Sequence, residues 1–243
     1  MLDLNAATWP EVKEAVEKGA VAVLAVGALE QHGHHLPLST DTVMSQGVAR
    51  RIAETIDGLL LPPIAYGDAW NNEAFAGTIS LGPDTIRAVL IDIGRGLARG
   101  GFKALVIING HFGNREPIAL AARALKMEHG FPVLHLDYPG MERIASEVCD
   151  SKPAAPTFYH ADEVETSMML ALAPELVRMD KAASEYPVFP KTFGMEAMGL
   201  DTFNRSGVFG DPRPATAVKG EALMAGILEQ SVRLIQAWLS KVG

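Results

Sequence analysis

The chain has 243 residues, of which 48% are hydrophobic, so it is long and apolar enough to bury a sizeable core. Its net charge of −8, with no Lys/Arg-rich run, argues against nucleic acids and anionic membranes as partners. No apolar run approaches the ~20 residues that a membrane-spanning helix needs, and the single cysteine, Cys149, is expected to be a structural thiol in a reducing, cytoplasmic environment.

The N-terminal part of the chain alternates helical and strand-like segments. A proline at the first turn and Gly19 at the end delimit a helix over 10–18, and the apolar run behind it predicts a buried strand over 21–27. Next we expect a helix capped by Thr40 or Asp41 and running to 56, a strand-like stretch over 59–65 whose two prolines suggest an edge or a bend, an irregular loop over 66–80, and a helix over 84–99.

The rest of the chain continues the same alternation. We expect a buried strand over 103–108, a helix over 116–128, a strand over 132–136, helices over 141–149 and 163–177, an irregular Gly-, Pro- and Phe-rich segment over 187–214, and a final helix over 220–242. Strands and helices with short connections are typical of a parallel sheet covered on both faces. No linker, repeat or low-complexity tract divides the sequence, which predicts one domain over residues 1–243.

Side chains that can bind metals cluster directly after the first buried strand. The stretch holds Glu30, His32, two further histidines and Asp41. The carboxyl ends of strands are where open α/β sheets bind ligands, and in an extended segment Glu30 and His32 point the same way. A polar loop with solvated histidines would explain one histidine alone. Four or five donors together favour a metal site.

A second polar group follows the strand over 103–108. His111 occupies the same topological place as Glu30 and His32, and two strand ends of one sheet can meet over a single pocket. Gly110 lets the backbone turn sharply and approach a ligand.

The irregular loop over 66–80 carries aromatic and amide side chains. Such residues suit a loop that faces a substrate, although they are equally common in ordinary packed loops. We expect contacts with the substrate from Trp70, Asn72, Gly110 and Phe112.

A third signal lies where the helix over 163–177 begins. Asp162, Glu163 and Glu165 are in or near its first turn, where the helix dipole and capping already explain negative charge. His160 is not explained in this way, because a cation is disfavoured at a helix N-terminus.

Three motifs, in this order and spacing, resemble the creatininase (creatinine amidohydrolase) family: Glu30-Gln-His-Gly-His-His-Leu-Pro with Asp41, Asn109-Gly-His-Phe-Gly-Asn114, and His160-x4-Glu165-Thr-Ser. Weaker similarities lie at 77–81 and 207–216, so the resemblance spans roughly residues 20 to 220. It implies a three-layer α/β/α fold with a mostly parallel central sheet, a two-metal hydrolase site and homo-oligomers, commonly hexamers.

The resemblance also assigns residues. It implies metal ligands at Glu30, His32, Asp41 and His111, with Asp41 as the bridging carboxylate. Creatininase proper has a glutamate two residues after the second histidine, where this chain has Gly113. Members with this glycine are expected to take the carboxylate from the later motif, which points to Glu165 as the fifth ligand. His160 aligns with the catalytic or substrate-contacting histidine.

The implied activity is hydrolysis of a small cyclic amide or formamide C–N bond through a hydroxide shared by two divalent ions. His160 would donate a proton to the departing nitrogen. Ligands without sulfur suit zinc, with manganese or Fe(II) as alternatives. The loop over 153–159 lacks the tryptophan of creatininase proper, so we expect a different member of the family. Two alternatives remain: a metal-dependent C–C or lactone-type hydrolase of a cyclic ketone, such as an inositol-derived diketone, and an inactive protein that binds a small molecule on the same fold.

Overall fold

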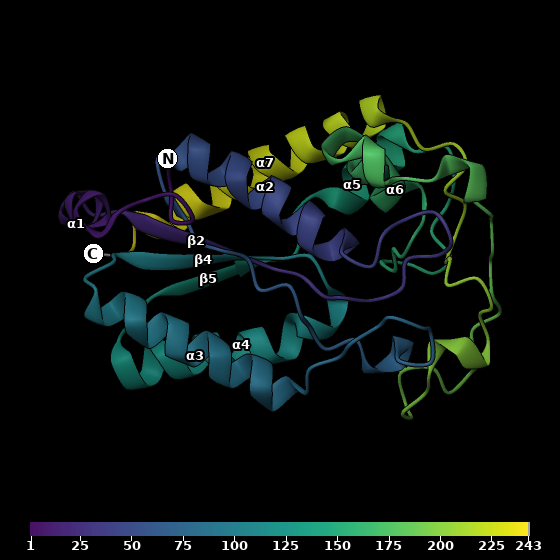
Figure 1. Ribbon diagram of the computed structural model, residues 1–243, viewed down its shortest axis with the longest axis horizontal. Helices are drawn as coiled ribbons and strands as arrows, with labels where there is room; N and C mark the ends of the chain where they lie inside the picture. Colours follow the sequence, from purple (N-terminus) through teal and green to yellow (C-terminus); the bar gives the residue numbers. More distant parts are fainter. Residues whose placement is uncertain (243) are drawn as a thin grey trace.

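A parallel sheet of five strands forms the centre of the computed structural model, which describes residues 1–242 (Figure 1). In order across the sheet, the strands are β1 (Leu2–Asp3), β3 (Leu59–Leu60), β2 (Val21–Val26), β4 (Ala104–Asn109) and β5 (Val133–Leu136). Every neighbouring pair is parallel, as the alternation of strands and helices predicted. The carboxyl ends of the strands therefore lie along one edge of the sheet.

Helices cover both faces of this sheet, which confirms the predicted three-layer α/β/α fold (Figure 1). One face carries α3 (Pro83–Arg99) and α4 (Arg115–His129), and the other carries α2 (Thr40–Ile56), α5 (Met141–Val148), α6 (Glu163–Leu172) and α7 (Ala217–Leu239). The short helix α1 (Trp9–Glu17) lies at the opposite end of the molecule from α6. Among the described helices, none is long and apolar enough to cross a bilayer.

The two central strands, β2 and β4, are buried along their whole length. Successive side chains point to opposite faces, so Val23 joins the apolar core under α2 and α7, and Leu24 joins the core under α3 and α4. Their register pairs Val26 with Asn109, the last residue of each strand. The residues that follow the two strands are therefore held side by side.

The prediction for residues 59–65 is partly wrong. β3 lies inside the sheet, between β1 and β2, and the outermost strand on that side is β1, which is too short to be recognised in the sequence. The expected bend is present: Pro62 and Pro63 interrupt the pairing after Leu60, which resumes as a single bridge between Val26 and Ile64.

The helix predicted over 163–177 is shorter than expected. α6 ends at Leu172, because Ala173 has a non-helical backbone (φ −152°, ψ 64°) ahead of Pro174. A 3-10 turn over Pro174–Leu176 follows. The first turn of α6, where the polar motif lies, begins at Glu163 as predicted.

A cluster of phenylalanines organises the irregular segment over 187–214. Phe158 packs with Phe189, Phe193 and Phe209 of this segment. Phe203 packs with the same three rings, and the ring-centroid distances within the cluster are 5.0–6.3 Å, with most pairs edge to face. The cluster fixes a segment that lacks long helices or strands, and Phe209 brings it against His160, with a centroid distance of 5.8 Å.

Candidate metal centre

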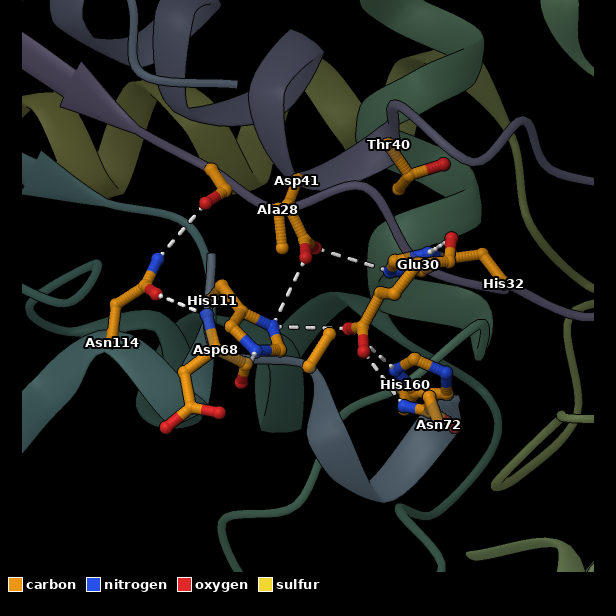
Figure 2. A network of polar contacts seen from close by, with 12 residues as sticks. Ala28, Glu30, His32, Thr40, Asp41, Asp68, Asn72, His111, Asn114 and His160 are labelled. Atoms are coloured by element: carbon orange, nitrogen blue, oxygen red, sulfur yellow. Dashed lines mark hydrogen bonds and ion pairs between the residues drawn. The ribbon is translucent and has the colours of Figure 1, made fainter. Parts of the chain in front are cut away.

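The ends of β2 and β4 bring Glu30, Asp41 and His111 together (Figure 2). The Nδ1 atom of His111 lies 3.0 Å from Glu30 Oε1 and 3.1 Å from Asp41 Oδ2. Glu30 follows β2, His111 follows β4, and Asp41 lies in the first turn of α2. All three side chains are buried, and their donor atoms are close enough together to bind one metal ion.

A second group of donors shares the same aspartate. His32 Nε2 lies 3.1 Å from Asp41 Oδ1 and 3.6 Å from Glu165 Oε2. These three residues are also grouped closely enough to hold a metal ion. One oxygen of Asp41 thus faces each group, which is the geometry of a carboxylate placed between two cations.

Backbone carbonyls orient the two histidines. His111 Nε2 lies 2.7 Å from the carbonyl oxygen of Asp68, and His32 Nδ1 lies 3.1 Å from that of Glu30. A carbonyl only accepts, so each of these nitrogens carries a proton and donates it. His111 Nδ1 and His32 Nε2 therefore face the carboxylates and are the ring nitrogens available to bind a metal ion. This arrangement of the second ring nitrogen is typical of histidines that bind metals.

Two atoms at the centre of the cluster support a metal site directly. His32 Nε2 and Asp41 Oδ2 are buried and make no hydrogen bond with any residue that the structure describes. Buried polar atoms without partners are unfavourable by about 1–3 kcal/mol, and more when charged. Imidazole nitrogens and carboxylate oxygens are ligands of Zn²⁺, Mn²⁺ and Fe²⁺, so the residues present fit one divalent ion in each group.

Burial and neighbouring charges shift the pKa values of the cluster. Burial opposes the charged form of His32, but the carboxylates of Asp41, Glu165 and Glu30 outweigh it and raise its pKa to about 10. His111 is also buried, and Glu30 and Asp41 raise its pKa well above its ordinary value. Burial raises the pKa of Glu165 to about 8.

The start of α6 delivers His160 and Glu165 to the same place. His160 precedes the helix and pairs with Phe209, whose amide donates to its carbonyl at 3.0 Å. Ala161 then adopts a left-handed backbone (φ 51°), and Asp162 caps α6 by accepting from the amides of Val164 and Glu165. This sharp turn lets two residues that are five apart in sequence lie in one site.

Glu163 points away from the metal-binding groups. Its carboxylate is almost completely buried and binds the ammonium of Lys219 and the amides of Asp150 and Ser151. Lys219, at the start of α7, also donates to Asp150 at 2.7 Å. Glu163 therefore ties α6 to α7 and to the loop after α5, whereas Glu165 faces His32.

Gly113 cannot be replaced by a larger residue in this backbone. A side chain there would overlap the carbonyl of Asp68 and would lie 2.8 Å from His111 Nε2. The same carbonyl orients His111. Backbone therefore fills the space beside Gly113, and the carboxylate of Glu165 on α6 lies 3.6 Å from His32.

A cavity of about 590 Å³ opens beside the two groups. Trp70 and Phe112 line it and are 47% and 60% exposed, so both are available to a substrate. Gly110 also lines it, but a side chain there would lie 2.5 Å from the carbonyl of Asp41, so packing alone requires glycine. Phe158 and Phe193 extend the apolar wall from the phenylalanine cluster.

Asn72 is held differently from the other three residues expected to contact the substrate. It is buried, its Nδ2 donates to Glu30 Oε2 at 2.7 Å, and its Oδ1 accepts from Gln31 at 3.0 Å. The hydrogen bond from Asn72 therefore engages Oε2 of Glu30, and Oε1 of Glu30 faces His111 (Figure 2).

Sequence reasoning missed Gln31 and the carbonyl of Asp68. Gln31 alternates with Glu30 and His32 in an extended segment, so its side chain points to the other side, and that alternation was an available signal. A backbone carbonyl leaves no such signal. Of the two neighbouring histidines, His34 is exposed and His35 is buried behind the site, with its Nε2 at 2.8 Å from Thr166 Oγ1.

Cys149 lies at the end of α5, outside this cluster. Burial raises the pKa of its thiol to about 12, which is the opposite of what a nucleophilic cysteine requires. This agrees with the structural role expected for the thiol.

Comparison with known proteins identifies relatives over nearly the whole chain. A family model described as creatinine amidohydrolase matches residues 5–235. A mycofactocin precursor peptide peptidase from Mycobacterium ulcerans is 34% identical, over 95% of this chain and 86% of the relative. A creatinine amidohydrolase from Pseudomonas putida is 32% identical, over 89% of each chain. Among solved structures, a Zn–Zn form of a mutant creatininase is 30% identical and superposes with a TM-score of 0.86, covering 97% of both chains.

Proposed function

Because the chain belongs to the creatininase family and is a hydrolase of that family, we propose that it is a dinuclear metal-dependent enzyme that hydrolyses amide C–N bonds. The observation that carries this proposal is the position of Asp41, whose two carboxylate oxygens face two separate groups of donors. A single carboxylate between two cations is what a two-metal hydrolase requires.

In this proposal the two ions would share Asp41, and each would have two further ligands. One would be held by Glu30, Asp41 and His111, and the other by His32, Asp41 and Glu165. The ions would supply Lewis acidity at the amide carbonyl and lower the pKa of water. Zinc, manganese and Fe(II) all suit this set of ligands. A structural zinc site is a weaker explanation, since such sites usually contain cysteine.

His160 is the catalytic side chain that we propose contacts the reacting amide. It lines the cavity, is buried, and its Nδ1 lies 3.8 Å from Glu30 Oε1. Burial, with the nearby His32, lowers its pKa to about 4, so it is neutral in the resting protein. A neutral imidazole can donate a hydrogen bond from its protonated nitrogen.

The size of the cavity favours a substrate larger than the small cyclic amide or formamide that the family resemblance implies. A volume of about 590 Å³ falls within the roughly 300–1,000 Å³ that is common for sites that bind drug-sized molecules. The apolar wall of Phe158, Phe193 and Trp70 suits a peptide with hydrophobic side chains. The peptidase relative agrees with this choice, and the creatinine amidohydrolase relative keeps a cyclic amide as the second candidate.

Two other activities fit the same residues less well. A metal-dependent hydrolase of cyclic ketones would use the same ions, but the two relatives named above act on amide bonds according to their names. An inactive binding protein would have no reason to keep three buried carboxylates together, since buried charges are unfavourable without cations.

The proposal is tested by metal analysis and a substrate screen on one preparation. The protein, purified without chelators, is expected to contain two divalent ions per chain by elemental analysis. The zinc- or manganese-loaded protein is then assayed with hydrophobic peptides, cyclic amides, formamides and cyclic ketones. We expect peptide hydrolysis that disappears after removal of metal with a chelator and returns when metal is added. One ion per chain, or turnover of ketones alone, would contradict the proposal.

A further inference from the structure

Gln31 makes the closest polar contact with His160. Its Nε2 lies 2.8 Å from His160 Nε2, and both side chains are buried. The two residues are 129 positions apart in sequence, so the contact joins the strand-end loop to the start of α6. Nothing in the two-metal chemistry requires this glutamine, because it faces neither group of metal-binding donors.

The backbone decides which way the amide of Gln31 points. Its Oε1 accepts from the amide of Gly33 at 2.9 Å. The two hydrogens of its Nε2 are shared among three acceptors: His160 Nε2 at 2.8 Å, Asn72 Oδ1 at 3.0 Å and, at 3.2 Å, the carbonyl of Gly207. An amide N–H only donates and a carbonyl only accepts, so the opposite orientation of the side chain would lose the bonds to Gly33 and Gly207. The NH₂ group of Gln31 therefore faces His160.

Two glycines make room for this orientation. Gly33 and Gly207 both have left-handed backbones, with φ of 65° and 78°. A side chain at Gly207 would overlap Gln31 Oε1. The local backbone is thus shaped around the amide of Gln31, which holds it in one rotamer.

A donor aimed at His160 Nε2 determines where the imidazole proton resides. A hydrogen bond from Gln31 requires a lone pair on Nε2, so the proton of the neutral ring is on Nδ1. Nδ1 is the nitrogen on the side of Glu30, where a substrate would meet the metal-binding groups. Asn72 links the two ends of the network, since it accepts from Gln31 and donates to Glu30.

We propose that Gln31 is a positioning residue that holds His160 as the neutral tautomer protonated at Nδ1, so that His160 serves the reaction as a hydrogen-bond donor from that nitrogen. This rests on the proposed amide hydrolase activity and replaces the proton donor suggested by the sequence. The reaction balances with one water, which supplies the hydroxyl group that joins the carbonyl carbon and the proton that joins the departing nitrogen. A fixed neutral donor stabilises negative charge that develops on the substrate oxygen.

Two variants of Gln31 distinguish a role in setting the tautomer of His160 from a role in packing alone. Gln31→Glu keeps the shape and the acceptor for Gly33, but its second oxygen would accept a proton from His160 Nε2 and so favour the other tautomer. Gln31→Met keeps the length without a donor, so both tautomers become available. Gln236→Glu, the same chemical change on the exposed face of α7, is the matched control.

The readout is the ring ¹⁵N signal pair of His160 in the zinc-loaded protein, identified by its loss in His160→Gln. We expect protonation at Nδ1 in wild type and Gln236→Glu, at Nε2 in Gln31→Glu, and a mixture in Gln31→Met. With metal content unchanged, kcat for an amide substrate should fall by ~10²–10³ in Gln31→Glu, as for loss of one preorganised donor, with a much smaller change in KM.

The outcome distinguishes this inference from the proposed function. A wild-type ring protonated at Nε2, protonated at both nitrogens, or unprotonated at Nδ1 would overturn the inference whatever the substrate screen finds. So would a single, unchanged tautomer in Gln31→Met. If the tautomers are as expected but no amide is hydrolysed, the proposed function fails and the positioning role of Gln31 stands.

Discussion

The two halves of the candidate metal centre are built in different ways. Glu30, His32 and His111 follow the central strands β2 and β4 within a few residues, and the register of those strands sets their spacing. His160 and Glu165 come from the start of α6, which is held over the sheet by long-range contacts to Phe209 and Lys219. The first half is fixed by local chain geometry, and the second depends on tertiary packing.

This difference has an energetic consequence. The strand half is embedded in two apolar cores, so disturbing it means unfolding the sheet. α6 also packs into the core through Val164, Met168 and Met169, but the turn that presents His160 and Glu165 depends on the left-handed Ala161, the Asp162 cap and the ion pair of Glu163 with Lys219. We therefore expect substitutions in the α6 half to loosen one metal ion while the sheet remains folded.

The largest effect is expected from Asp41→Ala, because the two carboxylate oxygens of Asp41 face both groups. Both ions should be lost, and kcat/KM should fall by ~10³ or more, since two-metal sites contribute several kcal/mol of transition-state stabilisation. Elemental analysis and kinetics check this. His111→Ala should lose one ion preferentially. Wild-type metal content in Asp41→Ala, or equal loss of both ions in His111→Ala, would contradict the two-group arrangement.

The next largest effect is expected from Glu165→Gln, compared with Glu163→Gln two residues away. Glu165 faces His32, so its variant should bind the ion of that group much more weakly and lose at least ~10² in activity while folding normally. Glu163 faces Lys219, so its variant should keep both ions but lower the free energy of unfolding. Metal analysis and urea denaturation on both variants distinguish the two. Loss of metal in Glu163→Gln alone would reverse the assignment.

The sequence predicted the strand half of the site better than the α6 half. A buried strand followed by Glu30 and His32, and another followed by His111, places these residues at one edge of a parallel sheet by topology alone. Glu163 and Glu165 lie two residues apart on a helix and so cannot both face one site, and only the resemblance to a family pointed to Glu165. The left-handed Ala161, which makes that placement feasible, has no signature in the sequence.

Other features depended on contacts that local patterns do not report. The strand β1 is two residues long and is defined by its pairing with β3. The bonds of Gln31 to His160 and Gly207 span 129 and 176 positions. The end of α6 could have been placed at Leu172, because Pro174 restricts the residue before it.

A smaller effect is expected from Lys219→Met, which weakens the anchor of the α6 half. Glu163 is almost completely buried and would lose its cation, which should lower the free energy of unfolding by about 3 kcal/mol. The ion held with Glu165 should bind ~10-fold more weakly, as when an orienting contact behind a metal ligand is lost. Lys126→Met, an exposed lysine of α4, is the control. Equal weakening of both ions would show that the two halves are not independent.

The smallest effect expected is the pH dependence of metal binding. It reports the protons released by His32 of the strand half and by Glu165 of the α6 half. Burial and the surrounding carboxylates raise the pKa of His32 to about 10, and burial raises that of Glu165 to about 8, in the metal-free protein. Both groups are therefore protonated at pH 7. A metal ion needs the lone pair of His32 and the charged form of Glu165, so binding must release protons.

The apparent binding constant of the His32 and Glu165 group should rise ~10-fold per pH unit for each proton released between pH 6 and 8. Titration calorimetry in two buffers of different ionisation enthalpy gives the number of protons. Glu165→Gln should release one proton fewer at this group, whereas Glu163→Gln should match wild type. The raised pKa of His32 also affects folding. Its charged form stabilises the folded, metal-free protein fully below pH 6.5, the ordinary pKa of histidine, and this stabilisation is lost as the pH rises toward 10. Metal binding that is independent of pH would mean that His32 is already neutral and Glu165 already charged, and the ion pair of His32 with Asp41 would then not form without metal.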